Sequence, residues 1–157
     1  KVDLNRAIRI VNGIVAQQLK LQNIIVKLDL EENIPFILAH NTRLEQVTFN
    51  LVTNARDAIL QKTKAGSEAG ASKITIRTFA ENNQVAVTVS DNGIGIPENV
   101  RHKVFEPFFT TKEVGKGMGL GLSITYGIVK DYNGQIEIQS REGLGTTIKL
   151  TFPCADA

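Results

Sequence analysis

The stretch QVAVTVSDNGIGIP, residues 84–97, leads from an alternating apolar segment into a glycine-rich turn that contains an aspartate. The alternation before Asp91 predicts a strand with one buried face. Asp-Asn-Gly is a strong turn sequence, so a tight turn explains Gly93 and Gly95. It does not explain a carboxylate at the end of an apolar strand. A second interpretation stays open, in which Asp91 accepts a hydrogen bond from an amine such as that of adenine and the glycines let the backbone approach a flat ligand.

Two long helices are predicted before this strand. Apolar residues recur at helical spacing up to about Gln22, behind Asp3 as a suitable N-cap. Thr42 and Glu45 form a capping box for a second helix that should reach about Lys64. The residues predicted to face the core are Leu4, Ile8, Val11, Val15 and Leu19 in the first helix and Leu44, Val47, Leu51, Ala55 and Ala58 in the second.

Short alternating runs bounded by turn residues predict about six strands. Two of them form a hairpin around Glu81-Asn82-Asn83, residues 98–104 form a short helix, and a third long helix runs from Leu122 to about Asp131. Together these elements predict a two-layer α/β sandwich, with three helices on one face of a mixed, mostly antiparallel sheet. The predicted strands are 24–30, 36–39, 72–80, 84–90, 135–140 and 146–152.

Composition and charge narrow the class of protein. The chain has 157 residues, 42% hydrophobic and 22% charged, which predicts one globular domain over residues 1–157. The net charge of +2 is small and no apolar run approaches the roughly 20 residues that span a bilayer, so we expect no nucleic-acid partner and no direct membrane contact. The single cysteine, Cys154, excludes an internal disulfide and a zinc cluster. Because the chain starts at Lys1 without a methionine, we expect a fragment of a longer protein.

A polar stripe flanks the apolar stripe of the second predicted helix. Asn50 and Asn54 are four residues apart and project from one face, and Gln46 and Asp57 extend the stripe. Its place at the rim of the core allows a cleft there. Side-chain amides can offer oxygens to a hard cation and N–H groups to phosphates. An ordinary solvated helix face stays open as the alternative.

The stretch GKGMGLGL, residues 115–122, has glycine at every second position and opens into a predicted helix. Bare backbone N–H groups at a helix N-terminus favour an anion, so the stretch is a candidate phosphate cradle. It has the spacing of neither G-x-x-x-x-G-K-[ST] nor G-x-G-x-x-G. Lys112, in the preceding FEPFFTTK (105–112), and Lys116 are candidate charges for phosphate oxygens. The length of the 105–121 segment indicates a functional lid, with a flexible linker as the alternative.

The order and spacing of five motifs resemble those of sensor histidine kinases. NLVTNARDA, DNGIGIP, FEPFFTTK, GKGMGLGL and GLGTT look like the N box, first glycine box, F box, second glycine box and final glycine motif of the catalytic and ATP-binding domain. The likeness covers nearly the whole chain, and the FTTK form is similar to the nitrogen-regulation-like subgroup. The resemblance implies the Bergerat α/β sandwich of the GHKL superfamily, ATP and Mg²⁺ as cofactors, and an ATP lid over residues 105–121.

The resemblance also implies site residues, position by position. Asn54 matches the asparagine that binds Mg²⁺, and Asn50 the one that helps hold the phosphates. Asp91 matches the aspartate that hydrogen-bonds the adenine amino group, and Thr146 a threonine near it. Many relatives have a basic phosphate-contacting residue where this chain has Asp57, which is expected instead to hold a water on the metal. The other implied ATP-binding residues are Gly93, Gly95, Ile96, Thr111, Lys112, Gly117, Gly119, Leu120, Gly121 and Leu122.

The implied function is transfer of the ATP γ-phosphoryl group to a histidine on a separate dimerisation domain, serving a response regulator indirectly in the cytoplasm. His40 and His102 lack the sequence context of the family's phospho-acceptor, so we expect that the acceptor domain is absent and assign no catalytic residue. An ATPase of the same superfamily and a nucleotide-sensing binding module are the alternatives. Those ATPases place a glutamate base where Asn50 stands, and an amide does not accept a proton near neutral pH, which disfavours hydrolysis.

Overall fold

A computed structural model describes residues 1–64, 66, 71–105 and 121–155 of the chain. In these residues five strands form one mixed sheet in the order β1-β2-β3-β5-β4. β1 pairs with β2 in parallel, and the other neighbouring strands pair antiparallel. The strands are β1 (Ile24–Leu30), β2 (Ser72–Glu81), β3 (Gln84–Asp91), β4 (Gln135–Arg141) and β5 (Gly145–Pro153).

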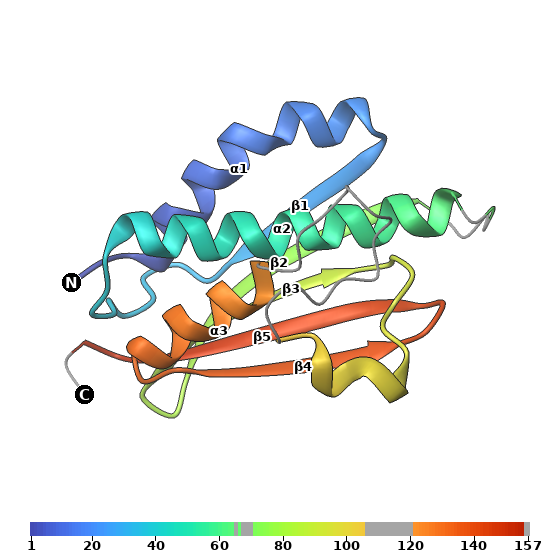
Figure 1. Cartoon of the computed structure of the whole chain (residues 1–157). Helices are drawn as coiled ribbons and strands as arrows, with labels where there is room; N and C mark the ends of the chain where they lie inside the picture. Colours follow the sequence, from blue (N-terminus) through green and yellow to red (C-terminus); the bar gives the residue numbers. More distant parts are fainter. Residues whose placement is uncertain (65, 67–70, 106–120, 156–157) are drawn as a thin grey trace.

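The α-helices of the described residues lie against one face of this sheet (Figure 1). They are α1 (Leu4–Leu21), α2 (Asn41–Lys64) and α3 (Gly121–Asp131). A short 3-10 helix, η1 (Glu98–Lys103), follows the turn after β3. The predicted α/β sandwich, with three helices on one face of a mixed sheet, is confirmed.

The apolar stripes of the two long helices form one side of the core. α1 begins after Asp3, whose side chain accepts a hydrogen bond of 3.0 Å from the N–H of Asn5. The predicted core residues of α1 are all buried, and so are those of α2 apart from Ala58, which is half-buried. The sheet side of the core is made by Ile24, Ile74, Ile76, Val85, Val87, Val89, Ile148, Leu150 and Phe152.

Asparagines in the left-handed backbone region close two of the connections. Asn82 and Asn83 have φ of 50° and 60°, which the two-residue hairpin turn between β2 and β3 requires. Asn133, with φ of 58°, lies just after the end of α3. The predicted hairpin and helix end are confirmed.

The predicted strand at 36–39 does not form. Ile37 alone pairs there, as an isolated bridge with Val2. Ile37 is buried, whereas Phe36 and Leu38 are exposed, so one side chain of this segment enters the core. Pro35, which precedes it, has no N–H with which to extend a ladder.

The second helix begins two residues earlier than the predicted capping box at Thr42 implies. The carbonyl of His40 accepts hydrogen bonds of 3.1 Å from the N–H groups of Arg43 and Leu44, which sets the first turn. Thr42 therefore lies inside the helix and not at its N-cap. No helix in the described part of the chain is long and apolar enough to cross a membrane.

Candidate functional site

Asp91 lies at the C-terminal end of β3, opposite Thr146 of β5. Its Oδ1 accepts a hydrogen bond of 2.8 Å from the N–H of Gly93. Burial raises the pKa of Asp91 to about 6. Hydrogen bonds from the backbone N–H groups of Gly93 and Thr146 and the positive charge of Lys62 act in the opposite direction and lower this pKa. A carboxylate in such a place is a strong acceptor that the protein itself uses only in part.

The glycines after Asp91 are required by close packing of the protein on itself. A side chain at Gly93 would place its Cβ 2.6 Å from the carbonyl carbon of Ala58 in α2. The N–H of Ile94 donates a hydrogen bond of 3.0 Å to the carbonyl oxygen of Ala58, which fixes the loop on the helix. Gly95 has φ of +75° and lies against the backbone of Arg141 at the end of β4. The loop is therefore held between α2 and the β4–β5 hairpin.

Ser140 of β4 joins this loop to β5, and sequence reasoning did not find it. Its Oγ accepts a hydrogen bond of 2.8 Å from the N–H of Ile96 and lies 2.8 Å from Oγ1 of Thr146. The guanidinium of Arg101, in η1, donates to the carbonyl oxygen of Ser140. The alternation of β4 puts Ser140 in the inward row with Ile136 and Ile138. A hydroxyl in an otherwise apolar row of the predicted strand is the feature of the sequence that could have indicated a role for Ser140.

The predicted asparagine pair faces the N-terminus of α3. The Nδ2 of Asn50 donates to the carbonyl oxygen of Gly121 at 3.3 Å and lies 3.5 Å from Oγ1 of Thr125. A Cβ added to Gly121 would lie 3.7 Å from Nδ2 of Asn54. That nitrogen is buried and has no hydrogen-bond partner among the described residues.

An unsatisfied buried amide is the feature that points to a polar ligand. Buried side-chain polar atoms are nearly always hydrogen-bonded. Because the amide of Asn54 has no partner among the described residues, a bound ligand could supply one. The nitrogen and oxygen of an amide exchange places by a half-turn, so either an acceptor or a donor can face a ligand there. The amide oxygen of Asn54 fits a hard cation that also binds phosphate oxygens. A single protein ligand leaves the other coordination positions of the cation to those oxygens and to water.

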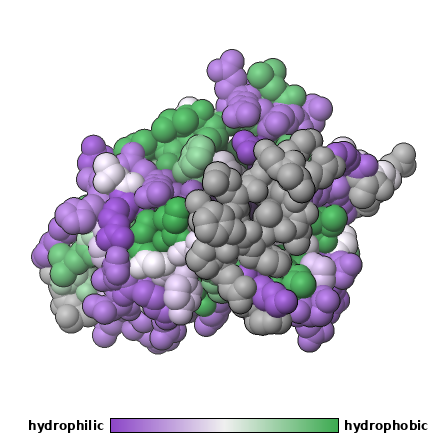
Figure 2. All heavy atoms as spheres, viewed as in Figure 1, coloured by the Kyte–Doolittle hydropathy of each residue, from purple (hydrophilic) through white to green (hydrophobic). Residues whose placement is uncertain are grey.

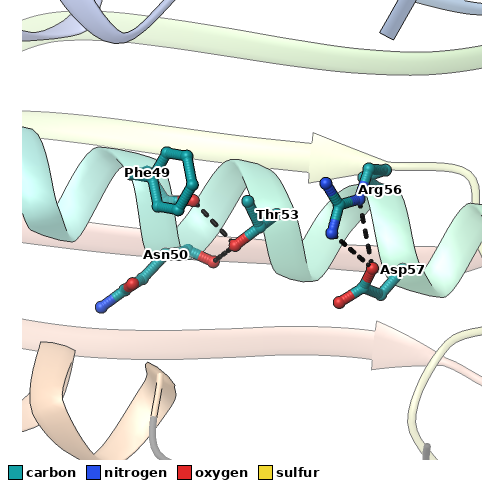
Figure 3. A network of polar contacts seen from close by, with 5 residues as sticks. All are labelled: Phe49, Asn50, Thr53, Arg56 and Asp57. Atoms are coloured by element: carbon teal, nitrogen blue, oxygen red, sulfur yellow. Dashed lines mark hydrogen bonds and ion pairs between the residues drawn. The ribbon is translucent and has the colours of Figure 1, made fainter. Parts of the chain in front are cut away.

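Asp57 forms an ion pair with Arg56 of the same helix. Its Oδ1 lies 3.0 Å from Nη2 and 3.2 Å from Nε of Arg56, and both side chains are mostly buried. In Figure 3, Asn50 and Asp57 extend from α2 below the helix axis, while Phe49 lies above it. Within the predicted polar stripe, Asn50 and Asp57 are thus held by hydrogen bonds, whereas Gln46 is exposed to solvent.

α2 carries both parts of the site. Asn50 and Asn54 face α3, and Ala58, one turn after Asn54, contacts the loop that follows Asp91. Leu122 packs partly against the core. In the described part of the chain no three His, Cys, Asp or Glu side chains gather as a metal cluster. The remaining predicted site residues, Thr111, Lys112, Gly117, Gly119 and Leu120, lie outside the described residues.

Comparison with known proteins identifies the family. Residues 39–156 match the model of the histidine kinase-, DNA gyrase B- and HSP90-like ATPases. The chain belongs to this family. The sensor kinase CckA of Brucella abortus is 44% identical over 138 residues, which are 84% of this chain and 15% of CckA. Sporulation kinase A of Bacillus subtilis is 34% identical over 152 residues, 97% of this chain and 23% of that kinase.

A solved structure narrows the comparison to the catalytic domain. The nucleotide-free catalytic domain of the histidine kinase ThkA is 33% identical, with a TM-score of 0.78 over 98% of this chain and 94% of that one. The chain is therefore a catalytic domain of the histidine kinase type, with the Bergerat fold, as the five motifs predicted. It spans less than a quarter of the length of the curated kinases described above.

Proposed function

We propose that this catalytic domain binds Mg-ATP between α2, the loop after Asp91 and the N-terminus of α3. In this proposal the γ-phosphoryl group passes to a histidine on a separate dimerisation domain. The observation that carries the proposal is the buried amide of Asn54, which has no partner among the described residues and stands 3.7 Å from where a Cβ of Gly121 would be. The position of Asp91 at the other end of the same helix surface supports it.

We assign the adenine to Asp91. An ionised carboxylate accepts hydrogen bonds and donates none, so it suits the exocyclic amine of adenine. Thr146 and Ile96 are held beside it through Ser140, and Gly93 and Gly95 fix the loop by their packing. These four residues thus set the shape of the base pocket.

We assign the phosphates and the metal to the other end of the site. Asn54 would be the protein ligand of Mg²⁺, and Asn50 and Asp57 would hold the surrounding polar shell. The N-terminus of α3, at Gly121 and Leu122, favours negative charge. Bound Mg²⁺ would neutralise charge on the phosphate oxygens, and positioning would supply the rest of the rate enhancement. Thr111, Lys112, Gly117, Gly119 and Leu120 complete the proposed ATP lid, residues 105–121.

Three further assignments rest on the resemblance and the comparisons. We infer that the whole chain is one domain of a longer kinase of the nitrogen-regulation-like subgroup, which the FTTK form supports. We infer a response regulator as the indirect partner, since ThkA has been solved in complex with the response regulator TrrA. We also infer a cytoplasmic location, where ATP is available.

A hydrolase of the same superfamily is the second candidate. Such an enzyme needs a general base near the attacking water. At the matching position the side chain of Asn50 donates to the carbonyl oxygen of Gly121, as an amide and not a base. The kinase is therefore the better supported function.

Calorimetric titration with ATP, with and without Mg²⁺, tests the proposal. Asn54→Ala should remove most of the Mg²⁺-dependent part of the affinity, roughly 10- to 100-fold, because a charge-assisted contact contributes about 1.5–3 kcal/mol. Asn41→Ala is the matched control, since Asn41 is exposed at the start of the same helix. If Asn54→Ala binds Mg-ATP as tightly as the wild type, the metal assignment is wrong.

A further inference from the structure

The outer surface of α1 exposes a row of large apolar side chains. Ile10, Ile14 and Leu21 are 38%, 69% and 78% exposed. At about 100° per residue these three positions fall within about 40° of one another, so they form one stripe along the helix. On the helical projection the stripe borders the buried stripe that packs on the sheet.

One large apolar side chain of the neighbouring helix is exposed on the same side of the molecule. α1 and α2 are neighbours on the same face of the sheet (Figure 1), and Phe49 of α2 is also exposed, by 44%. Figure 2 shows hydrophobic atoms gathered over α1 and toward α2 on this side of the molecule. Single exposed apolar residues are ordinary, whereas several on one side of a helix suit contact with another apolar surface.

Gly13 lies next to this stripe and has no structural reason to be glycine. A Cβ at this position would meet nothing within 4 Å. Glycine in the interior of a helix is less favourable than alanine by about 1 kcal/mol. Its absent side chain leaves the backbone of α1 open to close approach by a partner.

The charge of α1 selects the kind of partner. Arg6, Arg9 and Lys20 are exposed, and the helix contains no acidic residue. Asp3, the acidic residue nearest its start, is its N-cap. No ion pair engages Arg6, Arg9 or Lys20 within the part of the chain that the structure describes. On the helical projection these cations lie beside the apolar stripe, on the side of Gly13.

We propose that the α1 surface, formed by Ile10, Gly13, Ile14 and Leu21 with its flanking cations, binds an amphipathic helix of a partner protein. The partner helix carries an apolar stripe and a row of acidic residues along one flank. The stripe from Ile10 to Leu21 is about 16 Å long, or three helical turns, and one residue wide. That shape matches a single helix better than a membrane, which would favour a broad apolar face without Gly13.

Two synthetic peptides of 18 residues test the surface on the 157-residue chain. Both carry the same leucine stripe, one flanked by glutamates and the other by lysines. Fluorescence anisotropy should show saturable binding of the glutamate peptide and at least about tenfold weaker binding of the lysine peptide, since opposite charges attract across an interface. Equal affinities, or no binding of the glutamate peptide, would contradict the proposal.

Matched variants locate the binding. Ile10→Ser/Ile14→Ser should weaken the glutamate peptide about tenfold or more, as each buried apolar side chain contributes to affinity. Leu144→Ser is the control, because Leu144 is 61% exposed but lies between β4 and β5. Arg6→Glu/Arg9→Glu should weaken the glutamate peptide and strengthen the lysine peptide. Unchanged binding in both α1 double variants would remove the α1 surface from consideration.

Two further measurements separate the alternatives. The proposal would be overturned if the chain bound vesicles of phosphatidylglycerol and phosphatidylcholine, lost this binding in Ile10→Ser/Ile14→Ser, and bound neither peptide. That result would indicate a membrane-binding surface. Mg-ATP affinity should be the same in the α1 variants as in the wild type, since α1 contributes no residue to the proposed nucleotide site. A failure of the α1 surface would thus leave the proposed kinase function untouched.

Discussion

The negative charge of Asp91, at the end of β3, is disfavoured by burial. Burial raises its pKa from 3.8 to about 6, so the folded chain binds a proton more readily than the unfolded chain between these values. The free energy of unfolding contributed by Asp91 therefore decreases as the pH rises through this window. Asp91→Asn should remove this dependence, and above pH 6 the variant should be more stable than the wild type by up to about 2–3 kcal/mol. Urea denaturation from pH 4 to 8 without nucleotide measures it, and parallel pH profiles would contradict it.

The same carboxylate should make adenine binding depend on pH. The ionised form accepts hydrogen bonds only, and protonation competes with the amine of the base. The affinity for adenosine, which has no phosphate to titrate, should fall below pH 6 by up to about tenfold per pH unit. Asp91→Asn should bind adenosine weakly and evenly from pH 5 to 8. Competition with a fluorescent ATP analogue would give both profiles, and a flat wild-type profile would argue against Asp91 as the base-reading group.

Gly93 tests whether the loop after Asp91 depends on contact with α2. An alanine Cβ there would lie 2.6 Å from the carbonyl carbon of Ala58, and the Ile94–Ala58 hydrogen bond holds the two backbones close together. Gly93→Ala should therefore destabilise the fold by about 1–3 kcal/mol. Gly127→Ala, in α3 with nothing within 4 Å, is the control and should stabilise by about 0.5–1 kcal/mol. Thermal unfolding decides between these signs.

At the scale of elements, the β4–β5 hairpin supports the base pocket through Ser140. Ser140→Ala removes the acceptor for the N–H of Ile96 and the hydrogen-bond partner of the Thr146 hydroxyl. Each polar group left unsatisfied should lower the free energy of unfolding by about 1–3 kcal/mol. The variant should lose adenosine affinity but keep its affinity for Mg²⁺-tripolyphosphate, which lacks a base. Ser90→Ala is the matched control, because Ser90 bonds Thr147 away from the loop. Equal loss for both ligands would mean a general loss of structure.

Elements with a strong local period were predictable from the sequence, whereas contacts between elements were not. The stripes of α1 and α2 and the asparagine turn after β2 follow from neighbouring residues alone, and the structure confirms them. The single bridge at Ile37 was missed because whether a short apolar run pairs depends on what lies beside it. The roles of Ser140 and Gly93 required the pairing of β3 with β5 and the packing of the loop on α2, which join residues far apart in the chain.

At the scale of the molecule, α2 fixes the distance between the two ends of the site. Asn50, Asn54 and Ala58 follow one another at intervals of four residues, so they lie along one side of a rigid helix at about 6 Å per interval. Asp91 is tied to the last of these positions and α3 to the first. A ligand that needs both ends in place binds only the folded chain, so it should stabilise the fold by RT ln(1 + [L]/Kd), or about 2.7 kcal/mol at a hundredfold excess over Kd.

The geometry of α2 also bears on whether the chain can phosphorylate itself. His40 immediately precedes α2, fourteen residues before Asn54, and fourteen residues of helix extend about 21 Å. Its backbone N–H donates to the hydroxyl of Tyr132, after the end of α3, which holds His40 at that end of the molecule. Transfer requires the reacting atoms about 3–3.5 Å apart. His40 is thus out of reach of a phosphoryl group bound at Asn54.

Because His40 is out of reach and His102 lacks the sequence context of a phospho-acceptor, incubation with Mg²⁺ and [γ-³²P]ATP should leave the 157-residue chain unlabelled, even at concentrations that saturate its ATP site. Acid-labile radioactivity on the chain, resolved by alkaline gel electrophoresis, is the measurement, and calorimetry on the same sample shows that ATP is bound. His40→Gln and His102→Gln would identify the acceptor if label appeared. Label that is lost in His40→Gln would contradict the distance argument, because a histidine at the start of α2 would then have met the phosphate at its middle.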